Sequence, residues 1–106
     1  MRFTYNPETM TRLDFAHEWK HFGQLNQMID RGISPLKAKN MRAASAPAER
    51  GAYMYEEKLW NRAGLSPSPD YVKFHAGRLE EFEAGMFEHR RFVAQPHNSN
   101  WRGIDW

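Results

Sequence analysis

The residues of this 106-residue chain that could do chemistry by type and spacing form the stretch HEWKH, which begins at His17. On a helix, the pattern H-E-x-x-H places two histidines one turn apart, so His17 and His21 could bind one zinc ion while Glu18 acts as a general base. The longer form of this signature is missing, because Gln24 and Gln27 stand where a glycine and a third histidine would follow. The motif therefore supplies two metal ligands and no third one within itself.

The surroundings of the motif weigh against a metal site. Lys20 lies between the two histidines, and its positive charge would disfavour a metal ion through like-charge repulsion. A catalytic zinc needs a third protein ligand, which one of the carboxylates Glu49, Glu56 or Glu57 could supply. Zinc proteases of this kind also lay their substrate along a sheet edge, and almost no strand pattern occurs here. The sequence therefore predicts no catalytic residue, no bound metal and no cofactor, with the two histidines as the only metal candidates.

The composition predicts a small protein that uses part of its surface for binding. Its mean hydropathy of -0.84 is strongly hydrophilic, yet 14% of its residues are aromatic, which is more than one small core easily absorbs. Because large aromatic side chains anchor interfaces, we expect some of them to face a partner. The net charge of +2 argues only weakly for nucleic-acid binding. Without cysteine, disulfides and thiolate metal sites are excluded, and we expect no transmembrane helix or secretory signal.

The HEWKH stretch lies on the first predicted helix, which spans 7–31 and follows an N-terminal tail at 1–6. An Asn-Pro-Glu sequence predicts the helix start, and Gly32 predicts its end. On this helix we expect Trp19 to face the apolar side, whereas the two histidines and the lysine of the motif lie toward the polar side. The predicted apolar stripe consists of Phe15, Trp19, Phe22, Leu25 and Ile29.

The segment 35–63 is predicted to hold a short basic helix followed by a second main helix. A Ser-Pro pair ending at Pro35 predicts a helix start. A second proline, Pro47, predicts a break that separates the two helices. The second helix should run from Pro47 to Ala63, where Gly64 and the leucine after it predict a Schellman stop.

The last predicted helix, 69–94, carries the clearest periodicity and is followed by a C-terminal tail at 95–106. Its start follows a Ser-Pro-rich connector that ends in Asp70 as the predicted N-cap. We expect His75 and His89 to make one hydrogen bond each at a helix interface. The heptad seam, which could pack within the chain or against a partner, consists of Val72, His75, Leu79, Phe82, Met86, His89 and Val93.

These patterns predict a single all-α unit: a small irregular helical protein with about three main helices and extended N- and C-terminal tails. Basic residues without an acid between them could contact phosphate groups of RNA or lipid headgroups; they are Arg31, Lys37, Lys39 and Arg42. The residues predicted to form a partner interface are Trp19, Phe22, Val72, Leu79, Phe82, Met86, Trp101 and Trp106.

We interpret the chain as a non-catalytic accessory (supernumerary) subunit of a large assembly, which stabilises neighbouring subunits through helix packing and clamping tails. By analogy, the expected assembly is a mitochondrial respiratory-chain or ATP synthase complex, on the matrix side or at the inner membrane. The expected partners are other protein subunits, with a membrane surface as a further candidate and nucleic acid less favoured. The alternatives are a peripheral ribosomal or ribonucleoprotein component, and a small zinc-dependent hydrolase using His17, Glu18 and His21.

Overall fold

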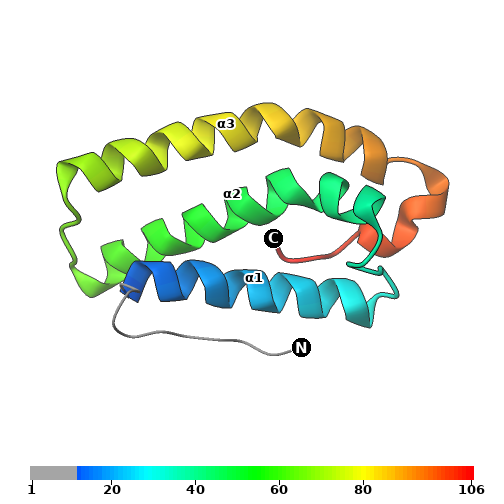
Figure 1. The fold of residues 1–106 in the computed structure, drawn as a ribbon, viewed down its shortest axis with the longest axis horizontal. Coiled ribbons are helices and arrows are strands. Elements are labelled where there is room, and N and C mark those ends of the chain that lie inside the picture. Colours follow the sequence, from blue (N-terminus) through cyan, green and yellow to red (C-terminus); the bar gives the residue numbers. More distant parts are fainter. Residues whose placement is uncertain (1–11) are drawn as a thin grey trace.

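The fold consists of three long helices and one short 3-10 helix, as seen in a computed structural model that describes residues 12–106 (Figure 1). The helices are α1 (Arg12–Asp30), α2 (Ala38–Ala63), α3 (Pro69–Val93) and η1 (Pro96–Trp101). Residues 12–106 contain no strand, so the predicted all-α class is confirmed. The predicted N-terminal tail and the Asn-Pro-Glu helix start lie outside the described residues.

Helix α2 is the central element of the fold. It packs against α1 on one side and against α3 on the other, in a molecule that measures 43 × 30 × 23 Å (Figure 1). Helix α2 therefore presents two buried faces, and its buried alanines Ala44 and Ala52 let the neighbouring helices approach closely. None of the helices within residues 12–106 is long and apolar enough to cross a bilayer.

Glycines end the first two helices where the sequence predicts. Gly32 has a φ of 74°, the left-handed conformation that favours glycine. The Ile33 N–H then donates to the Met28 carbonyl at 2.8 Å, which is a bond of the Schellman motif. Gly64 ends α2 in the same conformation, with a φ of 67°, so the predicted Gly-Leu stop is confirmed.

A single helix replaces the two that were predicted on either side of Pro47. Helix α2 runs from Ala38 through Pro47 without a break, although proline lacks the N–H that would bond the Ala43 carbonyl four residues earlier. His89 of α3 fills this gap, because its Nδ1 lies 2.8 Å from the Ala43 oxygen and donates to it. The predicted break was wrong because a side chain from another helix supplies the missing donor.

The start of α2 and the N-cap of α3 differ from the prediction. Helix α2 begins at Ala38, because Pro35 lies in the turn before it. Helix α3 begins at Pro69 as predicted, but its N-cap is Ser68 rather than Asp70. The Ser68 hydroxyl accepts a hydrogen bond of 3.2 Å from an N–H of the first turn.

The C-terminal segment 95–106 lies against its own chain, and its end returns to the middle of α2 (Figure 1). Gly51 of α2 makes room for it, since a Cβ at that position would lie 1.6 Å from the main-chain oxygen of Trp106. Two side chains of this segment enter the core, which sequence analysis had not assigned to it. That core consists of Met28, Ile33, Ala44, Trp101 and Ile104.

Candidate functional site

The face that α1 buries against α2 carries the two histidines of the HEWKH stretch. The side chains of His17 and His21 are 13% and 20% exposed, and Gln24 and Met28 continue the same face with 2% and 1%. Trp19, in contrast, is 50% exposed. The predicted orientation of α1 is therefore wrong, because polar partners on α2 hold the histidines at the interface.

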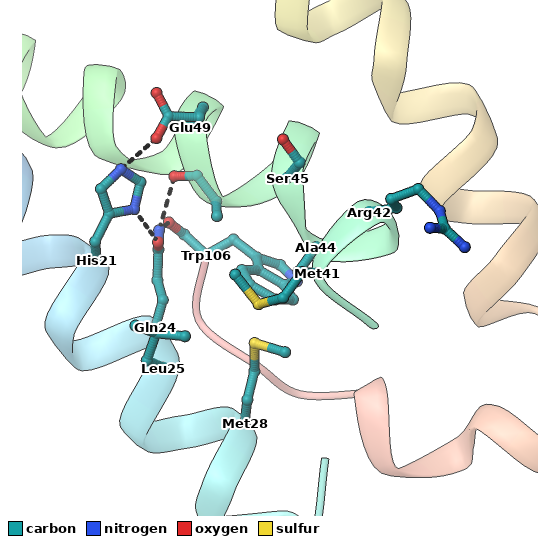
Figure 2. A pocket seen from close by; sticks show the side chains of 11 residues that line it. His21, Gln24, Leu25, Met28, Met41, Arg42, Ala44, Ser45, Glu49 and Trp106 are labelled. Carbon is teal, nitrogen blue, oxygen red and sulfur yellow. Dashed lines mark hydrogen bonds and ion pairs between the residues drawn. The ribbon is translucent and has the colours of Figure 1, made fainter. Parts of the chain in front are cut away.

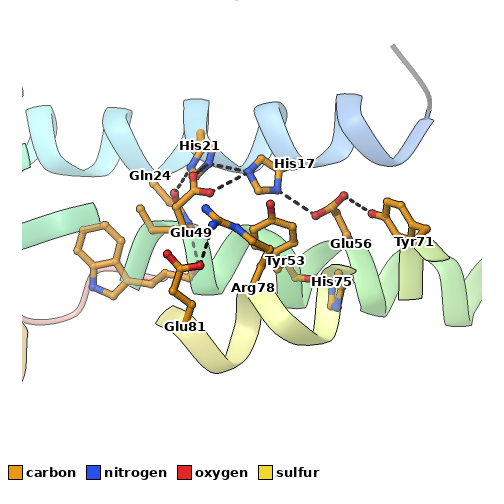
Figure 3. A network of polar contacts seen from close by, with 12 residues as sticks. His17, His21, Gln24, Glu49, Tyr53, Glu56, Tyr71, His75, Arg78 and Glu81 are labelled. Atoms are coloured by element: carbon orange, nitrogen blue, oxygen red, sulfur yellow. Dashed lines mark hydrogen bonds and ion pairs between the residues drawn. The ribbon is translucent and has the colours of Figure 1, made fainter. Parts of the chain in front are cut away.

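A network of polar side chains joins α1 to α2 and α3 (Figure 3). Glu49 of α2 contacts both imidazoles, since its Oε2 lies 3.5 Å from His17 Nε2 and its Oε1 pairs with His21 Nε2. On the other side of His17, the Nδ1 lies 2.9 Å from Glu56 Oε2. The Tyr71 hydroxyl of α3 donates to the second oxygen of Glu56 at 2.5 Å. Glu49 and Glu56 therefore each contact at least one histidine of α1.

The pairing within this network sets its charges. Burial lowers the pKa of His17, but hydrogen bonds with Glu49 and Glu56 outweigh that effect and raise the pKa to about 9. Burial also opposes the rise in the pKa of His21, which the contact with Glu49 nevertheless raises. Hydrogen bonds with the two histidines hold the pKa of the Glu49 carboxyl well below its usual range. Both histidines therefore favour their charged form, paired with the ionised Glu49 carboxylate.

The structure removes both local objections to a metal at this position. Lys20 points to the C-terminal segment, where its Nζ lies 3.7 Å from the carboxylate of Asp105, so its charge is directed away from the imidazoles. A third ligand is present as well. His17, His21 and Glu49 each offer one atom, and these atoms all lie within 4.8 Å of one another.

Two cavities flank the network. A cavity of about 490 Å³ lies between α1, α2 and the C-terminal segment, and Figure 2 shows His21, Glu49 and Trp106 around it. Its remaining wall is largely apolar and includes Met28. A second cavity, of about 400 Å³, has His17 in its wall and extends toward α3. Groups of the network therefore border both cavities, His21 and Glu49 the larger one and His17 and Glu56 the smaller one.

The heptad seam of α3 packs against α2 within the chain. His75 Nε2 lies 2.6 Å from the Tyr53 carbonyl, and His89 bonds the Ala43 carbonyl as described above. The prediction that each of these histidines makes one hydrogen bond at a helix interface is confirmed. Burial lowers the pKa of His89, so this histidine favours its neutral form.

The residues predicted to contact a partner occupy different positions in the fold. Of these, Trp19 and Val72 are exposed, Phe22, Leu79, Phe82, Met86 and Trp106 are half-buried, and Trp101 is buried. Sequence reasoning missed Phe74 and Phe87, the two exposed aromatic side chains of α3. They lie outside the heptad seam, so the heptad pattern gave no reason to predict them as contact residues.

The basic residues predicted to contact phosphate do not share one environment. Arg31 donates to main-chain oxygens of the C-terminal segment at 2.5 and 3.1 Å. The Lys39 ammonium lies 5.5 Å from the centroid of the Phe92 ring. All four residues, Arg31 included, are exposed.

In comparisons with protein-family models, curated proteins and solved structures, none matches this chain. The chemistry of the site therefore rests on its own geometry. The sequence pointed to His17 and His21, and it offered Glu49 among three carboxylates. No sequence signal pointed to Tyr71, because its partner Glu56 is 15 positions away on another helix.

Proposed function

We propose that this chain is a non-catalytic accessory subunit of a larger protein assembly. The observation that carries the proposal is the small number of aromatic side chains that the fold itself buries. Within residues 12–106, only Trp60 and Trp101 among the Phe, Tyr and Trp residues are buried. When a partner covers large apolar groups that were exposed to water, the free energy falls and the complex is stabilised.

The exposed apolar groups lie on several sides of the molecule. Leu36, in the connection between α1 and α2, is 95% exposed, and Phe74 and Phe87 of α3 are 57% and 62% exposed. At about 100° per residue, these two phenylalanines fall on opposite flanks of the α3 seam. Single exposed apolar residues are ordinary, but this distribution suits a subunit that is surrounded by neighbours rather than one with a single binding patch.

The charge distribution favours a protein assembly over a ribonucleoprotein. The Arg31 guanidinium is engaged by the chain's own C-terminal segment, which reduces the cationic surface available to phosphates. By analogy with the small accessory subunits of such complexes, the assembly is a mitochondrial respiratory-chain or ATP synthase complex.

Native electrophoresis of the chain expressed at its natural level tests the proposal. We expect the chain to migrate with a large particle that survives ribonuclease treatment, and mass spectrometry of that particle names its neighbours. Migration as a free 12.5 kDa monomer would contradict the proposal, and collapse of the particle on ribonuclease treatment would favour the ribonucleoprotein alternative.

Surface variants test which groups bind the neighbours. We expect Phe74→Ser and Phe87→Ser to lower incorporation into the particle while helix content stays unchanged, because both side chains are exposed in the free chain. Lys73→Ser, an exposed position on the same helix, is the matched control and should incorporate normally. Equal incorporation of all three variants would sink the assignment of α3 as a contact surface.

The non-catalytic part of the proposal has its own assay. We expect the chain, with or without added zinc, to leave a mixture of peptide and ester substrates uncleaved. Zinc-dependent cleavage that is lost in Glu18→Ala would replace this proposal with the hydrolase alternative.

A further inference from the structure

The convergence of three side chains between α1 and α2 points to a metal centre, which is independent of the proposed assembly role. We propose that His17, His21 and Glu49 bind one divalent transition-metal ion, for which zinc is the best fit. The His17 and His21 Nε2 atoms lie only 2.9 Å apart, and a Glu49 oxygen approaches each of them. Three potential ligand atoms therefore surround one point.

The hydrogen bonds on the far side of each imidazole fix which nitrogen is free to bind. His17 Nδ1 faces a carboxylate oxygen of Glu56 at 2.9 Å, and His21 Nδ1 faces the amide oxygen of Gln24 at 2.9 Å. The Gln24 amide is itself oriented, because its Nε2 donates to the Ala48 carbonyl at 3.0 Å. Both partner oxygens are acceptors, so each Nδ1 carries the proton. When a metal ion displaces the protons held at the Nε2 atoms, each Nε2 presents a lone pair to the shared point.

The spacing of the ligand atoms suits a tetrahedral ion. Zinc bonds to histidine nitrogen and carboxylate oxygen measure about 2.0–2.2 Å, so neighbouring ligand atoms of a tetrahedral site lie about 3.3 Å apart. The separations here are 2.9 Å between the two Nε2 atoms and 3.5 Å from His17 Nε2 to Glu49 Oε2. Glu49 Oε1 lies closer to His21 Nε2, as in a direct hydrogen bond, so this carboxylate would shift outward on binding the ion. A proton can bridge only two of the three groups, whereas a metal ion bonds all three at once.

The groups behind the ligands match those that support metal sites. A histidine ligand commonly donates its other N–H to a carboxylate, which fixes the ring and raises its basicity. Glu56 takes this role for His17, and the Tyr71 hydroxyl holds Glu56 in turn. Two carboxylates, Glu49 and Glu56, bring two negative charges next to the two imidazoles, which a divalent cation balances. The set of two nitrogens and one oxygen suits zinc and its neighbours in the first transition row.

Three protein ligands leave one coordination position of a tetrahedral ion for water or a small ligand. The ligands border both cavities, since His21 and Glu49 line the larger one and His17 lines the smaller one. An exchangeable ligand therefore has a route to the ion from at least one side.

Metal binding by the full chain, stripped with a chelator, tests the proposal. Calorimetric titration with Zn²⁺ should show one ion per chain, and substitution with Co²⁺ should give the visible absorption of tetrahedral cobalt. Long-range ¹H–¹⁵N spectra of the wild-type chain locate the ion without any substitution. On adding Zn²⁺, the Nε2 signals of His17 and His21 should shift, while those of His75, His89 and His97 should not.

Substitutions then rank the groups. His17→Ala, His21→Ala and Glu49→Gln should each lower zinc affinity more than a hundredfold, and Glu56→Gln about tenfold, the smaller effect typical of a group behind a ligand. His97→Ala, which removes an exposed histidine on η1, is the matched control and should bind zinc as the wild type does. Circular dichroism checks that each variant keeps its helix content.

Two results would overturn the metal centre. One is the absence of saturable one-to-one binding of Zn²⁺ and Co²⁺ by the folded wild-type chain. The other is binding that leaves the Nε2 signals of both α1 histidines unchanged, because the ion would then lie elsewhere.

Discussion

Histidines of α1 and α3 contact the two faces of helix α2, and the two faces bind them differently. On the α1 side, His17 and His21 meet carboxylates of α2. On the α3 side, His75 and His89 meet main-chain carbonyls of α2. A carboxylate stabilises the charged form of an imidazole, whereas a carbonyl oxygen accepts a hydrogen bond equally from the N–H of a neutral imidazole. The partner atom, and not the residue type, therefore decides whether a buried histidine holds charge or completes a helix contact.

The difference extends to what surrounds the histidines. On the α3 side, aromatic rings pack closely, with Tyr53 stacked on Phe82 at 6.1 Å between centroids and Trp60 at 4.8 Å from His75. On the α1 side, cavities of about 490 and 400 Å³ border the histidines, whereas the cavity beside His89 on the α3 side is smaller, about 280 Å³. We infer that the α3 face supplies rigidity and that the α1 face is the place for chemistry.

The largest predicted effect concerns the buried carboxylate of the α1 side. Glu56→Ala leaves His17 Nδ1 and the Tyr71 hydroxyl without their acceptor. We expect it to lower the free energy of unfolding by about 3 kcal/mol, as when one partner of a buried charged pair is removed. Urea unfolding of the metal-free chain at neutral pH measures the loss. Glu57→Ala, the neighbouring carboxylate, is the control, and an equal loss there would refute the special role of Glu56.

The second prediction concerns the close approach of the C-terminal segment to the α1 side of α2. Gly51→Ala places a methyl group onto the Trp106 main chain. We expect a loss of about 2–3 kcal/mol, the upper range for overpacking, and faster hydrogen exchange in residues 102–106. The control is Gly23→Ala, because nothing lies within 4 Å of that methyl group. It should raise stability by about 0.5–1 kcal/mol, and a stabilising Gly51→Ala would mean that the segment does not lie there.

The third prediction concerns the α3 side and links two residues 42 positions apart in the chain. His89→Leu leaves the Ala43 carbonyl without a donor, since Pro47 has no N–H to offer. We expect a loss of about 1–2 kcal/mol. In a Pro47→Ala background the helix supplies its own N–H, so the same substitution should cost about 1 kcal/mol less. A double-mutant cycle measures this coupling, and a coupling near zero would disprove the compensation.

Local signals in the sequence were sufficient for the helix ends and for the packing of α3. Gly32 and Gly64 end their helices because only a left-handed residue fits there, which is a property of a few neighbouring residues. The spacing of His75 and His89 likewise places both on one side of α3. These features depend on neighbours within a turn or on a repeat of seven residues.

The orientation of α1 and the continuity of α2 could not be predicted from such signals. Hydropathy favoured the aromatic stripe around Trp19 as the buried face, yet His17 is held by Glu56, 39 positions away. Pro47 predicts a break unless the donor from His89 is known. In both cases a polar contact between distant segments outweighs the local preference, and a single sequence does not reveal which segments meet.

The smallest predicted effect is a difference between the two faces of α2 in how stability depends on pH. Burial lowers the pKa of His89 below its ordinary value of 6.5, so below pH 6.5 the unfolded chain binds more protons there than the folded chain does. Stability should therefore fall as the pH drops from 6.5 toward 5. The charged groups near His89 are Arg90 on its own helix, which lowers its pKa further, and Lys39, Arg42 and Glu88, which line the same cavity.

The α1 histidines do not obscure this window. A raised pKa, as at His17, contributes stability that is complete below pH 6.5 and is lost as the pH rises through about 9. The lowered pKa of Glu49 adds a loss only below its ordinary value of 4.5. His89→Gln keeps an N–H donor for the Ala43 carbonyl but cannot titrate, so urea unfolding of this variant should show a flatter profile between pH 6.5 and 5 than the wild type. An unchanged profile would mean that the α3 face titrates no differently from the unfolded chain, and the contrast between the two faces of α2 would then lie in packing alone.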